Sequence, residues 1–172
     1  ALGMVVSAVV GMFETVVTQL PIIMCFQSLI LDMAGNVGTQ SLAVTIRVLM
    51  DESLAGQQKA ELVFKEMRIG LCNGGLLGLM SFVLIGLYIF AIKGKTIAFS
   101  YAVSACIGVA LLLAMLISSA VGTCIPLLFK KIKVDPAVAS GPLITTINDL
   151  VAVVSYYGLS WLFLIEFFHM AG

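Results

Sequence analysis

Charged residues are scarce in this chain of 172 residues. Asp, Glu, Lys and Arg make up only 10% of it, whereas 61% is hydrophobic and the mean hydropathy is +1.16. Soluble domains usually carry about 25% charged residues. The nine basic and nine acidic side chains sum to a net charge of zero, so there is no overall basic field to attract nucleic acid. The composition therefore predicts a protein embedded in a lipid bilayer, with no nucleic-acid partner.

The residues that hold transition metals are also few. The chain has one His and four Cys, with no CxxC pair and no His at ligand spacing. All four cysteines lie in apolar stretches, where Cys behaves as a small packing residue. This argues against a zinc, copper or iron site, and we interpret the thiols as packing groups: Cys25, Cys72, Cys106 and Cys124.

Long apolar runs predict an all-α membrane protein with five transmembrane helices per chain. The runs cover about 1–18, 20–48, 69–92, 96–128 and 136–168. The first is interrupted by Glu14 after 13 residues, and the chain starts at Ala1 without Met, so we expect the natural protein to begin earlier. The polar stretch 51–68 places Glu61 and Lys65 four residues apart, which predicts an exposed amphipathic connector.

Basic residues between the runs predict the orientation. Seven of the nine lie in the second-to-third and fourth-to-fifth connections, and two lie on the alternate side. By the positive-inside rule, the N-terminal side is cytoplasmic and the C-terminus is outside a cell membrane that the chain crosses several times. The seven are Arg47, Lys59, Lys65, Arg68, Lys130, Lys131 and Lys133, and the other two are Lys93 and Lys95.

The second predicted helix contains polar groups that lipid disfavours. Gly35 and Asn36 are followed closely by Thr39 and Gln40, and Asp32 lies one turn before Asn36. Glycines there permit close backbone approach or local unwinding. An Asp at mid-membrane costs roughly 2.5–3.5 kcal/mol, so such groups usually line a pathway. The alternative is interhelical hydrogen bonding that only holds a bundle together.

The fifth predicted helix carries a second polar set around Asp149. Pro142 cannot donate a backbone hydrogen bond, so we expect the helix to be broken there beside a cavity. Thr145 lies one turn before Asp149, and no Lys or Arg in this helix neutralises the carboxylate. A set of oxygen ligands favours a hard cation, and Mg²⁺ is commonly held by one or two carboxylates through its water shell.

Several further motifs lie in a fixed order along the five predicted helices. They are Phe13-Glu14, Ala34-Gly35-Asn36-Val37-Gly38-Thr39-Gln40 with Arg47, Lys65-Glu66, Gly122 with Pro126, Asp135-Pro136-Ala137-Val138-Ala139-Ser140-Gly141-Pro142 and Asn148-Asp149. These motifs resemble those of the MgtE family of magnesium transporters and channels. The resemblance implies that two chains form a homodimer around one pore. It also implies that Mg²⁺ is both bound and transported, and that the hydrated ion contacts the carboxylate of Asp149 and the backbone carbonyl of Thr145. It also implies Asp135 at the cytoplasmic mouth, Gly35, Asn36, Gln40, Pro142 and Asn148 along the pore, and Mg²⁺-sensing cytoplasmic domains of the CBS type in the full-length protein but not in residues 1–172.

Three alternatives remain open at this point. The ion could be Co²⁺, Mn²⁺ or Ca²⁺, because flexible oxygen sites admit several divalent cations. Asp32 and Asp149 could form the carboxylate pair of an intramembrane enzyme, although we predict no enzymatic activity. The spacing of Gly70, Gly74 and Gly78 could instead serve a purely structural bundle, with a partner helix in the same chain or another.

Overall fold

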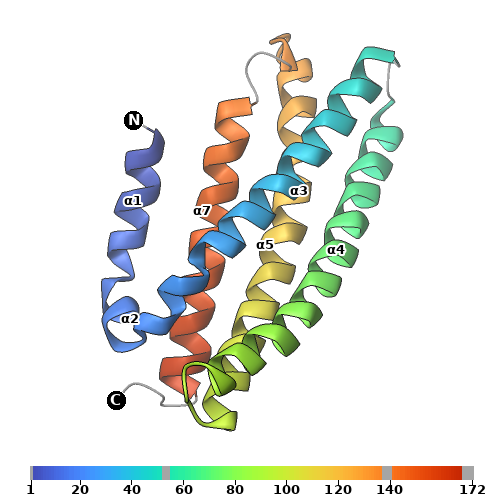
Figure 1. Ribbon diagram of the computed structural model, residues 1–172. Coiled ribbons are helices and arrows are strands. Elements are labelled where there is room, and N and C mark those ends of the chain that lie inside the picture. The colour runs from blue at the N-terminus through green and yellow to red at the C-terminus, as the bar shows by residue number, and fades with distance from the viewer. Residues whose placement is uncertain (1, 52–54, 137–140, 168–172) are drawn as a thin grey trace.

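The computed structural model describes residues 2–51, 55–136 and 141–167, and all regular structure in these ranges is helical (Figure 1). Four segments are long and apolar enough to cross a membrane: Pro21–Met50, Gly56–Ala91, Ile97–Lys131 and Gly141–Glu166. The elements are α1 (Leu2–Met12), α2 (Glu14–Gln19), η1 (Pro21–Ile23, a 3₁₀ turn), α3 (Met24–Asp51), α4 (Gly56–Ala91), α5 (Ile97–Lys131), α7 (Gly141–Leu159) and η2 (Ser160–Phe167, a π-helix).

The segment expected to form the first span is divided into two short helices. Phe13 interrupts them with φ −99° and ψ 17°, leaving 11 residues in α1 and 6 in α2. Neither reaches the about 20 residues that a straight span needs. Apolar side chains of α1 pack on the core, and the Phe13 ring stacks on Tyr157 with centroids 5.7 Å apart. The fold thus has four candidate spans, with α1 beside α7 (Figure 1).

The polar connector expected at 51–68 is mostly part of a membrane-length helix. α4 begins at Gly56 and runs without a break for 36 residues, about 54 Å. The side chain of Gln58 accepts a hydrogen bond from the backbone N–H of Ala55 at 2.7 Å, which caps the helix start. Glu66 is only 2% exposed and lies on the same buried stripe as Leu62. The segment is therefore an amphipathic helix, as its spacing predicted, but it continues into α4 and buries Glu66 instead of forming a separate exposed connector.

The glycine seam of α4 packs on α5 of the same chain. A Cβ added to Gly78 would lie 2.7 Å from the carbonyl oxygen of Gly108, and one added to Gly74 would lie 2.8 Å from Cα of Leu112. Real Cβ atoms essentially never approach this closely. Small residues at this seam allow two backbones to meet where lipid provides no hydrophobic driving force. The partner left open by the sequence is intramolecular.

Two tyrosines attach α7 to the start of α3. The buried Tyr156 hydroxyl donates to the carbonyl oxygen of Ile23 at 2.6 Å, and the Tyr157 hydroxyl donates to Oε1 of Gln27 at 2.6 Å. These bonds join residues about 130 positions apart in the chain. They fix the height of α7 along α3, and therefore the height at which its polar residues face that helix.

Both strongly basic connections lie at one end of the bundle. Figure 1 shows the end of α3, the start of α4, the end of α5 and the start of α7 together there. The ammonium group of Lys130 donates to the backbone carbonyl of Leu49 at 2.5 Å, so α5 caps the end of α3. The α4–α5 connection, with Lys93 and Lys95, lies at the opposite end beside η1. The sequence asymmetry in basic residues thus corresponds to two ends of one structure.

Candidate functional site: an oxygen-lined groove between α3 and α7

One face of α3 carries a row of polar side chains. Asp32, Asn36 and Thr39 follow one another at helical spacing, and all three are exposed. The Asn36 amide donates to Oδ2 of Asp32 at 3.3 Å, which orients the carboxylate along the helix. The Thr39 hydroxyl donates to the carbonyl oxygen of Gly35 at 2.9 Å. Because these hydrogens point back into the helix, the side chains present mainly acceptor oxygens to the outside.

α7 presents a matching pair. Thr145 and Asp149 are four residues apart on one face of a helix that starts at Gly141. The Thr145 hydroxyl donates to the carbonyl oxygens of Gly141 and Pro142, both at 3.1 Å, so its lone pairs remain available as acceptors. Pro142 lies in the first turn, where a missing N–H costs nothing, and α7 continues unbroken beyond it. The residues before Gly141, where a break was expected, lie partly outside the described ranges.

The two faces together line one open groove of about 470 Å³. Its polar walls are two carboxylates, an amide and three hydroxyl groups, and no basic residue lines it. Within the part of the chain that the structure describes, no cluster of three or more His, Cys, Asp or Glu could hold a metal ion. The groove therefore suits a hard cation that keeps much of its water shell. Its residues are Ser28, Leu31, Asp32, Gly35, Asn36, Thr39, Thr145 and Asp149.

Asn148 points away from this groove and into the protein. Its side chain is 0% exposed and lies against Gly38, where an added Cβ would be 2.7 Å from the Asn148 Cγ. Neither amide atom has a hydrogen-bonding partner among the described protein atoms. Gly38 also meets α5, since a Cβ on Gly122 would overlap the Gly38 carbonyl oxygen. Gly38 thus occupies a junction of three helices, and α3 stays helical there instead of unwinding.

The remaining predicted site residues lie elsewhere. Gln40 is exposed on α3 and Pro142 is exposed on α7, and neither lines the groove. Asp135 is exposed and lines a separate pocket of about 340 Å³ with Lys130, next to the end of α3. Of the eight predicted residues, the groove collects four: Gly35, Asn36, Thr145 and Asp149.

The sequence analysis named Asp32 and Thr39 in the polar row of the second predicted helix but assigned neither to the metal site or the pore, and it did not name Ser28. All three line the groove with Asp149. Together with Asn36, these residues occupy positions i, i+4, i+8 and i+11 of one helical face, counted from Ser28. That spacing was the available signal. Lining one groove does not by itself show whether the two carboxylates act as an enzymatic pair, so the choice between an enzyme and a transporter depends on the register of the two helices and on the family.

The helices are long enough to cross a membrane, and the groove between two of them is lined by oxygen atoms and by no basic residue. This combination is typical of integral-membrane domains that bind or transport hard cations. A family model described as a divalent cation transporter, MgtE, matches residues 27–159. The chain belongs to the MgtE family, as its motifs indicated. This is a family of transporters and not of enzymes, so the interpretation of Asp32 and Asp149 as an enzymatic pair is not supported.

Three relatives support the same assignment, each a protein named magnesium transporter MgtE. Those of Bacillus subtilis and Enterococcus faecalis are each 34% identical over 163 residues, which is 95% of this chain and 34% of the relative. That of Thermus thermophilus is 31% identical over 163 residues, which is 94% of this chain and 34% of the relative. The chain thus spans about a third of the length of these proteins.

Proposed function

We propose that this chain forms the membrane pore of a Mg²⁺ transporter, in which the α3–α7 groove conducts the ion. The observation that carries the proposal is the groove itself, where Asp32 and Asp149 meet no basic residue. Two carboxylates without a counter-ion repel each other, and a cation removes that repulsion. The name of the relatives, magnesium transporter, points to Mg²⁺ as that cation.

A homodimer completes the pore in this proposal. The groove is open, so one chain supplies only part of the wall that an ion needs. A two-fold axis beside α7 would bring a second copy of the same groove to face the first, because a symmetric dimer uses the same surface twice. Each chain then contributes an Asp149 carboxylate, and the ion is recognised through its water shell with the Thr145 carbonyl assisting.

The bilayer placement follows from the basic residues. The end that holds Lys130 and the start of α4 faces the cytoplasm, and the C-terminal end faces outward. The α1–α2 segment accompanies α7 as a fifth membrane segment, supported by the stacking of Phe13 on Tyr157. Asp135, beside the end of α3, then stands at the cytoplasmic mouth. Regulatory CBS-type domains in the full-length protein would lie on this side.

Replacing Asp149 tests the proposal. In proteoliposomes, we expect Asp149→Asn to reduce Mg²⁺ uptake and to weaken Mg²⁺ binding about 10–100-fold, the range for groups that act on a metal through an intervening shell. Glu61→Gln, an exposed carboxylate at the start of α4, is the matched control and should leave uptake unchanged. Uptake that survives Asp149→Asn in an intact dimer would refute the assigned role.

The choice of ion is tested by competition in the same liposomes. Mg²⁺ demands near-octahedral geometry and releases water reluctantly, whereas Ca²⁺ accepts more ligands at longer distances. We therefore expect Ca²⁺ to compete poorly with Mg²⁺ at equal concentration. Equal competition by Ca²⁺, Co²⁺ or Mn²⁺ would leave the transporter assignment intact and remove the selectivity for Mg²⁺.

A further inference from the structure

Two buried polar side chains inside the bundle have unmet hydrogen-bonding capacity. Ser118 on α5 and Asn148 on α7 are both 0% exposed. The hydroxyl oxygen of Ser118 and both amide atoms of Asn148 have no hydrogen-bonding partner among the protein atoms that the structure describes. Buried polar groups in folded proteins nearly always have a partner, either from the protein or from ordered water. These three atoms therefore indicate a bound molecule that supplies their hydrogen bonds.

The register of α5 and α7 brings the two residues to one level. The helices run in opposite directions (Figure 1), and the sulfur of Cys106 lies 3.7 Å from the hydroxyl oxygen of Ser160. Ser118 follows Cys106 by 12 residues, and Asn148 precedes Ser160 by 12 residues. Each is thus about 18 Å along its helix from that contact, in the same direction. Ser118 and Asn148 therefore lie at the same height in the bundle.

The packing of Gly38 gives the same placement independently. Gly38 of α3 lies against the Asn148 amide and also against Gly122 of α5. Ser118 precedes Gly122 by one turn on the same face of α5. Asn148 is therefore level with the turn of α5 that runs from Ser118 to Gly122. The unpaired hydroxyl and the unpaired amide both belong to the junction of α3, α5 and α7.

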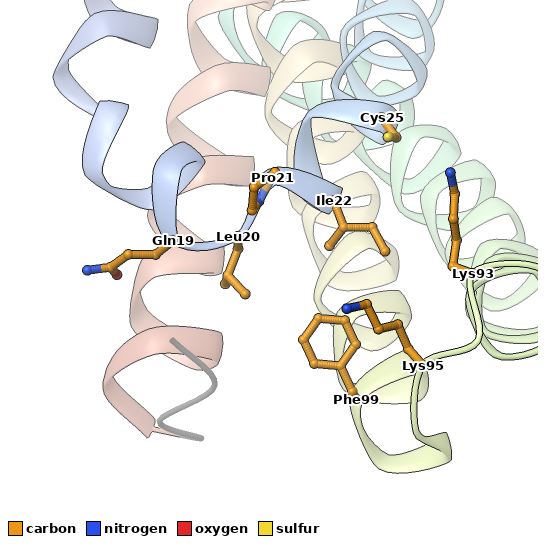
Figure 2. Close-up of a pocket in the computed structure, with 8 residues that line it drawn as sticks. All are labelled: Gln19, Leu20, Pro21, Ile22, Cys25, Lys93, Lys95 and Phe99. Carbon is orange, nitrogen blue, oxygen red and sulfur yellow. The ribbon is translucent and has the colours of Figure 1, made fainter. Parts of the chain in front are cut away.

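This junction is separate from the open pockets on either side of it. Neither Ser118 nor Asn148 lines the α3–α7 groove. Neither lines the pocket of about 530 Å³ at the η1 end, which Figure 2 shows beside Pro21 and the α4–α5 connection. Solvent in those pockets therefore does not hydrate the two side chains. A hydroxyl and an amide carry both donors and acceptors and no charge, which suits water, and a buried water typically makes about three hydrogen bonds.

We propose that Ser118 and Asn148 bind a buried water at the junction of α3, α5 and α7, and that this water fixes the rotation of α7 about its axis. Because Asp149 follows Asn148 in α7, holding Asn148 inward directs Asp149 toward the groove. Ser118 and Asn148 are then positioning residues. The effect on Asp149 rests on the proposed function of the groove, whereas the water site does not.

A double-mutant cycle in detergent tests the water site. Ser118→Ala and Asn148→Leu should each lower the midpoint of thermal unfolding by about 2–10 °C, because each leaves the other polar groups of the site unpaired. The double variant should lose less than the sum, because it removes the site as a whole. Ser100→Ala is the matched control on α5. Its hydroxyl is also buried but donates to the carbonyl oxygen of Thr96 at 2.8 Å, so its effect should add to that of Asn148→Leu.

The opposite sign would overturn the water site. In a dry junction, Ser118→Ala and Asn148→Leu would remove polar atoms that already lack partners, and each would raise the unfolding midpoint. Additive losses in the Ser118 and Asn148 pair would show that the two residues share no water.

Mg²⁺ titration of the same variants tests the positioning role. Ser118→Ala should weaken Mg²⁺ binding about 10-fold although Ser118 lines no part of the groove, and Ser118→Thr, which keeps the hydroxyl, should retain more of it. Coupled stabilities with unchanged Mg²⁺ binding would keep the water and refute its role in placing Asp149. If the unchanged chain bound no Mg²⁺, the proposed function would fail, while the unfolding cycle would still decide the water site.

Discussion

The contact between Gly38 and Asn148 gives the sharpest test of how α3 and α7 are placed. An alanine at position 38 would put its Cβ 2.7 Å from the Asn148 Cγ and 2.9 Å from its Oδ1. The Asn148 side chain is 0% exposed, so it cannot swing into open space. We therefore expect Gly38→Ala to force the two helices apart at the groove.

The expected magnitude combines two opposing effects. Overpacking a closely packed contact costs about 1–3 kcal/mol. Replacing Gly by Ala inside a helix gains up to about 1 kcal/mol of helix propensity. Gly75→Ala supplies a control that isolates the second effect, because nothing lies within 4 Å of a Cβ at that position of α4. The two variants should therefore differ in stability by about 1–3 kcal/mol, with Gly38→Ala the less stable.

A double-mutant cycle measures the contact itself. Asn148→Ala removes the buried amide that has no partner among the described atoms, and its space can receive the new methyl group of Gly38→Ala. We expect the double variant to be more stable than the sum of the single changes by about 0.5–3 kcal/mol. Thermal unfolding in detergent gives the stabilities, and Mg²⁺ titration gives the binding. Because Asp149 follows Asn148 on α7, binding should weaken in Gly38→Ala and recover in the double variant.

Additive effects in this cycle would refute the reasoning. If Gly38→Ala behaved like Gly75→Ala, the close approach of α3 to α7 would be absent in the folded protein. If stability recovered in the double variant while Mg²⁺ binding stayed weak, the contact would be real but would not place the groove. The two readouts thus separate the packing argument from the functional one.

Three further predictions concern other contacts. Gly78→Leu should destabilise the protein by several kcal/mol, because even a Cβ there would lie 2.7 Å from a carbonyl oxygen of α5, whereas Gly75→Leu faces open space and should be tolerated in thermal unfolding. Tyr156→Phe should cost about 0.5–1.5 kcal/mol in the same assay, because it removes the buried hydrogen bond from the hydroxyl to the carbonyl oxygen of Ile23. In the proposed pore, Asp32→Asn should weaken Mg²⁺ uptake while the protein stays folded, and uptake equal to that of the unchanged chain would remove Asp32 from the proposed pathway.

The all-helical fold and the positions of the long spans were predictable because a helix that crosses a membrane needs a long run of apolar residues. The predicted spans 20–48 and 96–128 correspond closely to α3 and α5, and both helices end near charged residues. The length of α4 was not predictable in the same way. The sequence predicts solvent exposure for the charged residues Glu61, Lys65 and Glu66. The helix nevertheless continues through them, and Glu66 is buried. A charged residue in a connector reports exposure only when no neighbouring helix covers it.

The groove was half predictable for a related reason. Thr145 and Asp149 share a helical face, so their spacing alone placed them together. Asn148 is adjacent to Asp149 in sequence but lies about 100° around the helix, which turns it toward Gly38 and into the protein. A motif read as a continuous string therefore combines a groove residue with a packing residue. Only the position of α3 shows which is which.

The register between α3 and α7 also bears on Asp32. The two helices run in opposite directions along the bundle (Figure 1), and Gly38 lies opposite Asn148. Asp149 is then nearly level with residue 37, and Asp32 lies about five residues, or roughly 7.5 Å, nearer the η1 end. The two carboxylates are therefore successive positions along one groove, and not a pair at one height. In the proposed pore, successive acidic positions would let an ion leave one carboxylate as it meets the next, and conduction requires sites that release the ion in this way. An enzyme that activates water with two carboxylates needs them at one point.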